Sequence, residues 1–224
     1  MNEKNASMLE KKIEAAIVWV RTHQERFWTV VGVIVMASLF LYFAIQQHVR
    51  QQNEAWAQLG PIQGALAQNQ TDTARKSLAD WQTHYGTSNA ASYAQFLKGD
   101  LLYKTSDYVS AAQIYAEVAQ AGKPALVQPL ALSAEISAEE MAGNIKAARA
   151  TAQRFVEKYP DHFFAASAYL SQARLAEMSG DMPAAQAIYE RFVILYPQSP
   201  WTASVRSQLQ SHSPAPTVNP SLAK

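Results

Sequence analysis

The chain has 224 residues, enough for one domain of ordinary size and an appendage, and 49% of them are hydrophobic. The formal net charge is +1, and residues 51–224 hold 13 Lys and Arg against 14 Asp and Glu, which argues against nucleic acid as a partner because phosphate binding needs clustered positive charge. The absence of cysteine excludes disulfides, thiolate nucleophiles and cysteine-ligated metal centres.

The first long predicted element is a transmembrane helix over residues 27–46. Phe27 to Ile45 is a run of 19 residues without a charge, and as a helix it spans about 29 Å, the thickness of a hydrocarbon core. Trp28 and Tyr42 lie near its two ends, where such rings favour the headgroup layer. A cleaved signal peptide would begin earlier, be shorter and end in a small-x-small site, so the pattern predicts an anchor.

Charges on either side of this span predict its orientation. The flanking basic residues are Lys11, Lys12, Arg21 and Arg26 before the span, and only Arg50 after it until Arg75. Because basic flanks stay in the cytoplasm, residues 1–26 are predicted to be cytoplasmic and the large C-terminal part to be translocated.

The cytoplasmic segment is partly amphipathic. Its apolar residues recur every three or four positions: Leu9, Ile13, Ala16, Ile17 and Val20. Such a stripe is typical of a helix that lies along the membrane surface or docks on another membrane subunit. The alternative is that this segment merely extends the membrane helix into the cytoplasm.

Residues 51–210 are predicted to form a helical repeat domain with a period of 37 residues. The segments 107–115 and 181–189 are alike and lie 74 residues apart, and the segment 144–152 falls between them in register. A turn-forming residue precedes each copy, and each copy keeps an alanine where two helices approach; these residues are Ser106, Gly143 and Gly180, and Ala111, Ala148 and Ala185. Asp or Asn then opens the next helix.

A second marker of the period is the pattern FxxxYP, which ends at Pro160 and again at Pro197, where proline closes the second helix of a pair. Tyr85 and Gly122 occupy the equivalent tyrosine positions upstream. The register therefore predicts a degenerate first copy, with a first helix over residues 56–68 that Gly60-Pro61 interrupts.

The C-terminal part completes the predicted fold. Ser199-Pro200 opens a final helix over residues 201–210, which would cap the apolar face of the last repeat. Residues 211–224 are predicted to be a disordered tail, because they contain three prolines and little to bury. The fold class is thus all-α, with a transmembrane helix followed by an α-solenoid of three to four helix pairs and a capping helix.

The markers at Gly99, Ala111 and Tyr115, together with the closing prolines, resemble tetratricopeptide repeats, whose common period is about 34 residues. A short cytoplasmic segment, one anchor and a translocated repeat domain together resemble the YfgM-like family, ancillary subunits of the SecYEG translocon. This resemblance implies a bacterial inner-membrane location and a periplasmic repeat domain.

The sequence lacks a pattern that predicts catalysis. It contains no phosphate-binding glycine loop, nucleophile elbow or His-x-x-x-His pair, so we expect no enzyme, cofactor, metal or small-molecule substrate. The carboxylates of Glu139 and Glu140 point in different directions on a helix, which favours a solvated face over an acid and base pair.

A stacked array of helix pairs instead offers a concave surface, lined by the first helix of each pair. In the repeat register the groove-facing candidates are Tyr93, Phe96, Asp100, Tyr103, Leu130, Arg174 and Glu177. Aromatic residues interleaved with charges are suited to an extended or helical peptide. The alternative is that residues such as Phe96 and Leu130 pack between repeats.

Two functions remain open at this point. The first is a scaffold that assists protein translocation or envelope protein folding, with translocon subunits or periplasmic folding factors as partners. The second is a structural accessory subunit of another membrane complex, in which the repeats clamp a fixed neighbour. A transient client needs an open groove, whereas a permanent neighbour fills it over a larger apolar interface.

Overall fold

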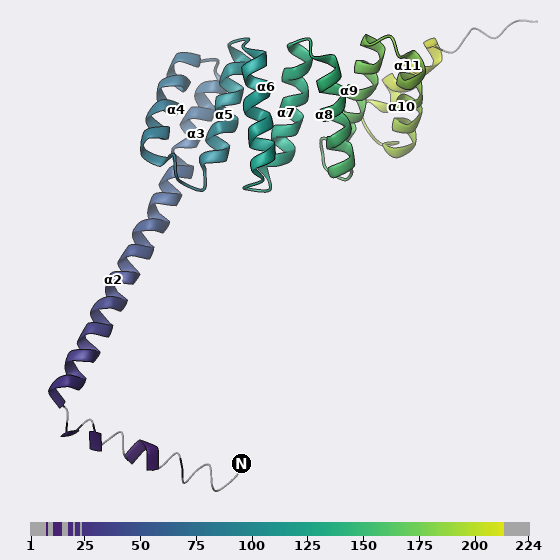
Figure 1. The fold of residues 1–224 in the computed structure, drawn as a ribbon. Helices are drawn as coiled ribbons and strands as arrows, with labels where there is room; N and C mark the ends of the chain where they lie inside the picture. The colour runs from purple at the N-terminus through teal and green to yellow at the C-terminus, as the bar shows by residue number, and fades with distance from the viewer. Residues whose placement is uncertain (1–7, 9–10, 15–17, 20, 23, 213–224) are drawn as a thin grey trace, which may run out of the picture. The chain divides into compact units, whose positions relative to one another are not determined.

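The computed structural model describes residue 8 and residues 11–14, 18–19, 21–22 and 24–212. The described residues form ten helices, α2 to α11, and no strand (Figure 1). The chain divides into two compact units, Met1–Asn53 and Glu54–Lys224. The predicted all-α class, an apolar N-terminal helix followed by repeated helix pairs, is confirmed.

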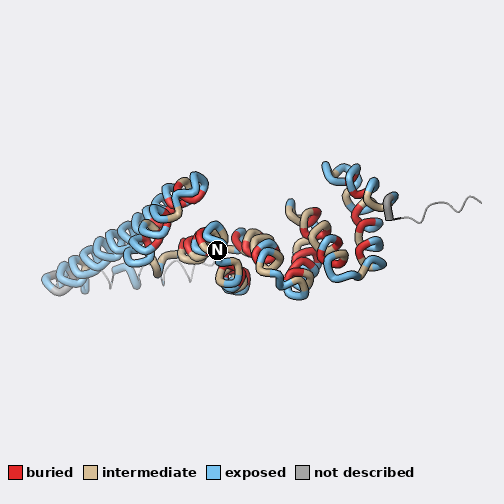
Figure 2. Tube along the Cα trace, turned by 90° about the horizontal axis from the view of Figure 1, so that it is seen from above, coloured by how far each residue is buried: buried red, intermediate tan, exposed pale blue. Residues whose placement is uncertain are grey.

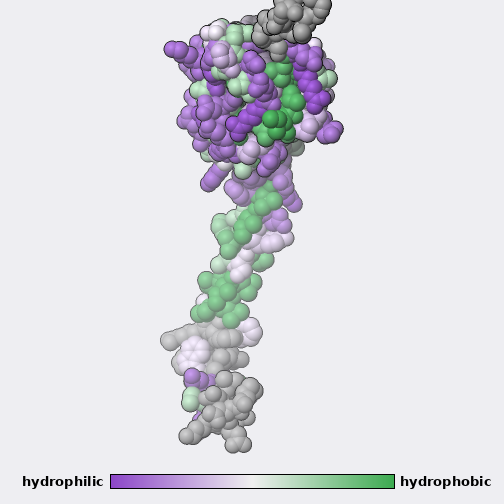
Figure 3. All heavy atoms as spheres, turned by 90° about the vertical axis from the view of Figure 1, so that its right-hand side faces the viewer, coloured by the Kyte–Doolittle hydropathy of each residue, from purple (hydrophilic) through white to green (hydrophobic). Residues whose placement is uncertain are grey.

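The first unit is dominated by α2, Gln24–Ala57, whose last residues already belong to the second unit. It holds the stretch that, within the described residues, is long and apolar enough to cross a membrane, and none of its most apolar window is buried. Figure 3 accordingly colours much of this helix as hydrophobic. Of the predicted amphipathic stripe only Ile13 is described; Leu9, Ala16, Ile17 and Val20 lie outside the described residues, as does most of the predicted tail.

The second unit is a stack of four antiparallel helix pairs and one further helix. The pairs are α3 Leu59–Ala67 with α4 Thr71–Tyr85, α5 Ala91–Lys104 with α6 Tyr108–Ala121, α7 Val127–Met141 with α8 Ile145–Lys158, and α9 Ala165–Met178 with α10 Met182–Leu195. The last helix, α11 Thr202–His212, packs against α10 and buries Val205 and Thr202. We call this unit the repeat domain.

The turn within each pair shows the 37-residue period directly. It contains one residue with a positive φ angle, and these residues are Asn69 at 58°, Ser106 at 64°, Gly143 at 77° and Gly180 at 76°. A left-handed residue ends the first helix and lets the chain reverse, which is why glycine or asparagine is favoured there. Because Asn69 takes this position in the first copy, the degenerate copy is a true member of the array.

The next residue opens the second helix of the pair. Asp107 and Asp181 accept hydrogen bonds from the backbone N–H groups of Ser110 and Ala184, at 3.2 and 3.3 Å. These bonds satisfy donors that a helix start leaves unpaired. Asn144, predicted to do the same, is at the N-cap but makes no side-chain cap hydrogen bond.

The first repeat differs from the prediction in where its first helix begins. The break falls at Gln58, between the end of α2 at Ala57 and the start of α3 at Leu59. Gly60 and Pro61 therefore do not interrupt a helix. Proline is tolerated in the first turn of α3, because the N–H groups there have no partner within the helix.

Packing within the repeat domain places small residues where helices approach and aromatic rings between them. Ala111, Ala148 and Ala185, one period apart, are 1% exposed or less. The largest side chains that are almost fully buried include Tyr115, Phe155 and Phe192. Figure 2 shows buried residues throughout the repeat domain, whereas most of α2 is exposed.

Candidate functional site

The repeat domain has two faces, and the first helices of the pairs line the inner one. Helix α3 contacts α5, α5 contacts α7 and α7 contacts α9, whereas the second helices α4, α6, α8 and α10 do not contact one another. Helices that lie closer together on one side of a stack make that side concave. We call the surface of α5, α7 and α9 the inner face and the surface of the second helices the outer face.

Aromatic rings form a continuous chain that runs from the end of α2 through the inner-face helix α5 to α6. The ring of Trp56 lies 5.8 Å from that of Tyr93, Tyr93 stacks on Phe96 at 5.9 Å, and Phe96 lies 5.5 Å from Tyr115. Tyr93 and Phe96 are partly buried, and both pack against more than one cluster of the core. They therefore link neighbouring repeats, which is the packing role that the sequence predicted as the alternative for Phe96. Both side chains are only partly buried, so each also remains partly accessible.

Asp100 is held in place by the same cluster. The hydroxyl group of Tyr115 donates a hydrogen bond of 2.6 Å to its carboxylate. Burial raises the pKa of Asp100, while the hydrogen bond from Tyr115 and the charge of Lys104 oppose that shift. Burial and the neighbouring Asp100 charge also raise the pKa of Tyr115 well above its usual value, so its hydroxyl stays a donor. The structure thus brings Phe96 and Asp100 into contact with Tyr115, and Tyr93 stacks on Phe96.

Tyr103 and Leu130 lie further along the inner-face helices. Tyr103, near the end of α5, is partly buried and makes an edge contact with Tyr108 at 5.2 Å. Burial, and then the nearby Tyr108 and Glu140, raise the pKa of Tyr103. Leu130 is partly buried on α7.

Each of the two charged candidates on α9 interacts with a side chain on another helix, either α7 or α11. Arg174, whose side chain is half exposed, forms an ion pair with Glu140 of α7. Glu177 accepts a hydrogen bond of 3.1 Å from Gln208 of α11. The C-terminal part of the inner face is therefore lined by polar side chains that neighbouring helices hold in fixed positions, and these do not join the aromatic chain on α5.

An acidic cluster on α7 overturns the expectation that Glu139 is on a solvated face. Glu135 is only 4% exposed, and it accepts hydrogen bonds from Arg154 at 2.8 Å and Thr151 at 3.3 Å. Burial, with the neighbouring Glu135 charge, raises the pKa of Glu139 to about 7. One carboxylate oxygen each of Glu135 and Glu139 is buried without a hydrogen-bond partner. Glu140, by contrast, pairs with Arg174, so the carboxylates of the neighbouring residues Glu139 and Glu140 point in different directions.

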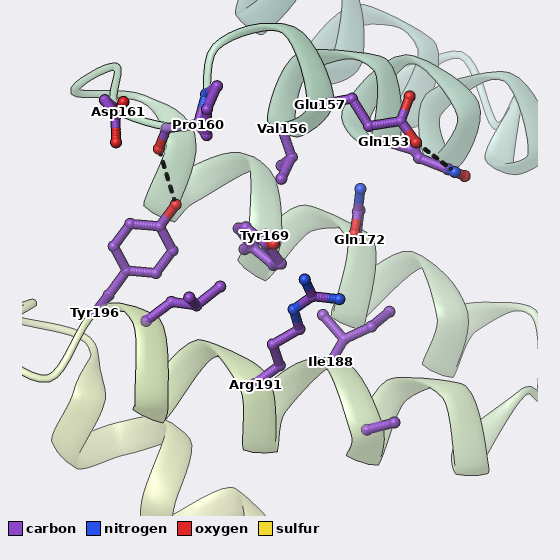
Figure 4. Close-up of a pocket in the computed structure, with 12 residues that line it drawn as sticks. Gln153, Val156, Glu157, Pro160, Asp161, Tyr169, Gln172, Ile188, Arg191 and Tyr196 are labelled. Atoms are coloured by element: carbon purple, nitrogen blue, oxygen red, sulfur yellow. Dashed lines mark hydrogen bonds between the residues drawn. The ribbon is translucent and has the colours of Figure 1, made fainter.

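A groove on the outer face did not feature in the sequence prediction. It lies between α8 and α10, has a volume of about 740 Å³, and is floored by Tyr169 and Gln172 of α9 (Figure 4). Arg191 lies on one wall and Glu157 on the other, where Glu157 is hydrogen bonded to Gln153. In the repeat register Gln172 is one period after Glu135, so the sequence shows only that a polar residue recurs at this position of the first helices. Because a solenoid is expected to bind through the first helix of each pair, the sequence did not predict a groove between second helices.

Within the described residues, no group of three or more His, Asp or Glu side chains is placed to hold a metal ion. The surfaces instead offer partly exposed aromatic rings and oriented polar groups, which suit contacts with polypeptide.

Comparison with known proteins agrees with this architecture. The family model of the tetratricopeptide repeat matches residues 62–125 and 134–200, more than half of the chain. No curated protein matches the chain. The two matched segments include part or all of every helix of the four pairs, so the chain belongs to the tetratricopeptide repeat family, whose repeats generally serve as protein-interaction modules.

Proposed function

We propose that the protein is a membrane-anchored scaffold that binds other proteins through its repeat domain on the translocated side of a bacterial inner membrane. In this proposal α2 crosses the membrane and residues 1–26 remain in the cytoplasm. The bound proteins are translocon subunits, periplasmic folding factors or secreted chains, so that the scaffold assists translocation or envelope protein folding.

The observation that carries the proposal is the inner face of the repeat domain. Its partly exposed rings, Tyr93, Phe96 and Tyr103, lie on one helix, and Arg174, whose half-exposed side chain is paired with Glu140, lies two repeats further on. Aromatic rings and arginine are the side chains that most often dominate the energy of protein interfaces. Their polar neighbours are already held by hydrogen bonds within the domain. Binding therefore costs little additional side-chain entropy.

The apolar helix supports the membrane part of the proposal. A tether that holds the repeat domain at the membrane raises the effective concentration of any partner that is held there too. Modest affinity at the inner face is then enough for stable association. The near-neutral charge of the repeat domain favours polypeptide partners over nucleic acid.

Site-specific photo-crosslinking in native membranes tests the proposal. A crosslinking amino acid is placed at Tyr103 on the inner face and, as a matched control, at the exposed Arg191 on the outer face. We expect Tyr103 to capture translocon subunits, a periplasmic folding factor or secreted chains, and Arg191 to capture none of them. Cells that express an exported variant without residues 1–50, which leaves the whole repeat domain in place, show whether the tether is needed.

Two other outcomes would change the assignment. Stoichiometric capture of one subunit of an unrelated membrane complex would favour the accessory-subunit function. Capture only through Arg191 would move the binding site to the outer groove and contradict the inner-face proposal.

A further inference from the structure

The three connections between consecutive pairs and the connection from α10 to α11 lie along one edge of the repeat domain, and the turns within pairs lie along the opposite edge (Figure 1). The connections are residues 86–90, 122–126, 159–164 and 196–201. Trp56 Nε1 donates a hydrogen bond of 2.8 Å to Asn89 in the first connection, so the chain enters the domain at this same edge. The hydroxyl of Tyr196 likewise reaches Pro160 at 3.3 Å and joins the last two connections. We call this the connection edge.

Large apolar side chains project into solvent from the connection edge. Leu126 is 75% exposed and Phe163, one period later, is 85% exposed. Ile194 and Trp201 add further exposed apolar surface around the last connection. A cavity of about 530 Å³ opens there, lined by Phe163, Leu195, Tyr196, Pro197, Pro200 and Trp201 among others.

The exposed aromatic residues distinguish this edge from the opposite one. At the turns within pairs the exposed apolar residues include the methionines Met141 and Met178, and polar links such as Lys104 to Asn69 at 2.8 Å join neighbouring turns. Trp and Tyr rings favour the boundary between lipid and water, because one end of each ring is apolar and the other polar. A row of protruding side chains at loop tips, one in each of the last three connections, suits shallow insertion into a lipid layer better than the clasping of a peptide.

We propose that the connection edge is a membrane-interface surface, at which Leu126, Phe163 and Trp201 insert into the headgroup layer of the bilayer that holds α2. This inference rests on the proposed anchoring by α2. The charged groups on the edge, Lys123, Lys158 and Asp161, nearly balance. The contact is therefore apolar in origin, and neutral phosphatidylcholine is sufficient for it.

The length of α2 is compatible with this contact. Nine helical residues lead from Ile45, the end of the apolar run, to Glu54, the first residue of the repeat domain, and they rise about 14 Å. The headgroup layer accounts for about 5 to 8 Å of that rise.

Fluorescence quenching in vesicles tests the inference with the full chain. Because the chain has no cysteine, a single Gln198→Cys substitution directs an environment-sensitive fluorophore to the last connection while Leu126, Phe163 and Trp201 stay intact. The protein is reconstituted into phosphatidylcholine vesicles with nitroxide-labelled lipid in both leaflets, so its orientation does not matter. Met178→Cys reports the opposite edge, and Phe40→Cys reports the apolar helix itself.

We expect strong quenching at position 40, quenching at position 198 at least about twofold greater than at position 178, and little effect of salt. Replacing Leu126 and Phe163 together by serine should lower the quenching at position 198 to the level at position 178. The matched replacement of Met141 and Met182 by serine should leave it unchanged. Circular dichroism checks that each variant keeps its helices.

The contrary outcomes separate the two proposals. Quenching at position 40 without excess quenching at position 198 would overturn the membrane-interface surface and leave the anchor standing. No quenching at position 40 would overturn the anchor and this inference with it. A photo-crosslinker at Phe163 in native membranes should attach to lipid, and attachment to protein alone would show that a partner covers this edge instead.

Discussion

Gly99 of α5 lies so close to the ring of Tyr115 of α6 that a Cβ atom added to Gly99 would be 2.5 Å from Cε1 of the tyrosine. The ring cannot easily move away, because it is buried and its hydroxyl group is hydrogen bonded to Asp100. We therefore expect Gly99→Ala to lower the free energy of unfolding by about 1 to 3 kcal/mol through overpacking. Urea unfolding of the full chain in detergent, followed by circular dichroism, measures this loss.

Gly64 provides the matched control for this substitution. It lies within α3, where an added Cβ would have no neighbour within 4 Å. Alanine is the better helix former, so Gly64→Ala should raise the free energy of unfolding by up to about 1 kcal/mol. Equal effects of the two substitutions would show that the contact with Tyr115 does not govern the response at Gly99.

A second prediction concerns the alanines that recur every 37 residues. Ala148 is fully buried on α8, whereas its neighbour Ala147 is exposed on the same helix. Leucine at position 148 should destabilise the repeat domain by about 1 to 3 kcal/mol, because the added carbons have no space between the packed helices. Leucine at position 147 should change stability by less than about 0.5 kcal/mol. A neutral Ala148→Leu would mean that the repeat register does not place this alanine at a helix contact.

A third prediction concerns the dependence of stability on pH. Burial and the Glu135 charge raise the pKa of Glu139 from the ordinary 4.5 to about 7, so the folded chain holds this proton more tightly than the unfolded chain. The resulting stabilisation is complete below about pH 4.5 and is lost as the pH rises through about 7. Unfolding free energy should therefore fall by on the order of 1 to 3 kcal/mol between pH 5 and pH 8.

Glu139→Gln isolates this effect, because glutamine keeps the shape and cannot ionise. The variant should lose most of the decrease between pH 5 and pH 8, and it should be more stable than the natural chain at pH 8. Glu190→Gln, at an exposed position of α10, serves as the control and should retain the decrease. The idea fails if both variants follow the same pH profile as the natural chain.

The periodic features of the fold were accessible from sequence because each has a local cause. A left-handed turn needs Gly, Asn or another tolerant residue, so Ser106, Gly143 and Gly180 mark the turns within pairs. Proline cannot continue a helix, so Pro160 and Pro197 mark the ends of second helices. These constraints act within a few residues, and a repeat presents them several times.

Features that depend on contacts between repeats were harder to predict. Gly60-Pro61 looks like a helix break in sequence, but its effect depends on whether it falls in the first turn or the middle of a helix. In the sequence Glu139 resembles a solvated residue. In the structure it is partly buried, with Glu135, Thr151 and Arg154 as neighbours. Likewise, the repeat register places Tyr93 and Phe96 on α5, but it does not reveal how far each ring contributes to packing.

The fourth prediction is the orientation of the chain in the membrane. Basic residues are concentrated before the apolar part of α2, so residues 51–224 should be on the translocated side. A fusion of alkaline phosphatase after Gln70 should be active, and a matched fusion to a cytoplasmic reporter should be inactive. The reverse pattern would place the repeat domain in the cytoplasm and exclude periplasmic partners.

The last prediction tests which face of the repeat domain binds protein. Tyr103 packs against only a small part of the core, and the side chain of Arg174 is half exposed, so each can be truncated with less damage to the fold than Tyr93 or Phe96. Loss of an aromatic or arginine anchor at an interface costs more than about 1 kcal/mol, so Tyr103→Ala and Arg174→Ala should each weaken the recovery of partners about fivefold or more. Tyr103→Phe should retain most of the binding if burial of the ring provides the energy.

Arg191→Ala on the outer face is the matched control for Arg174→Ala, since both remove an exposed arginine from the same repeat. Recovery of crosslinked or co-purified partners from membranes, normalised to the amount of folded protein, gives the comparison. Because the inner face carries the aromatic residues, Arg191→Ala should leave recovery unchanged. If Arg191→Ala weakened recovery while Tyr103→Ala and Arg174→Ala had no effect, the groove between α8 and α10 would be the binding site and the inner face would serve only to hold the repeats together.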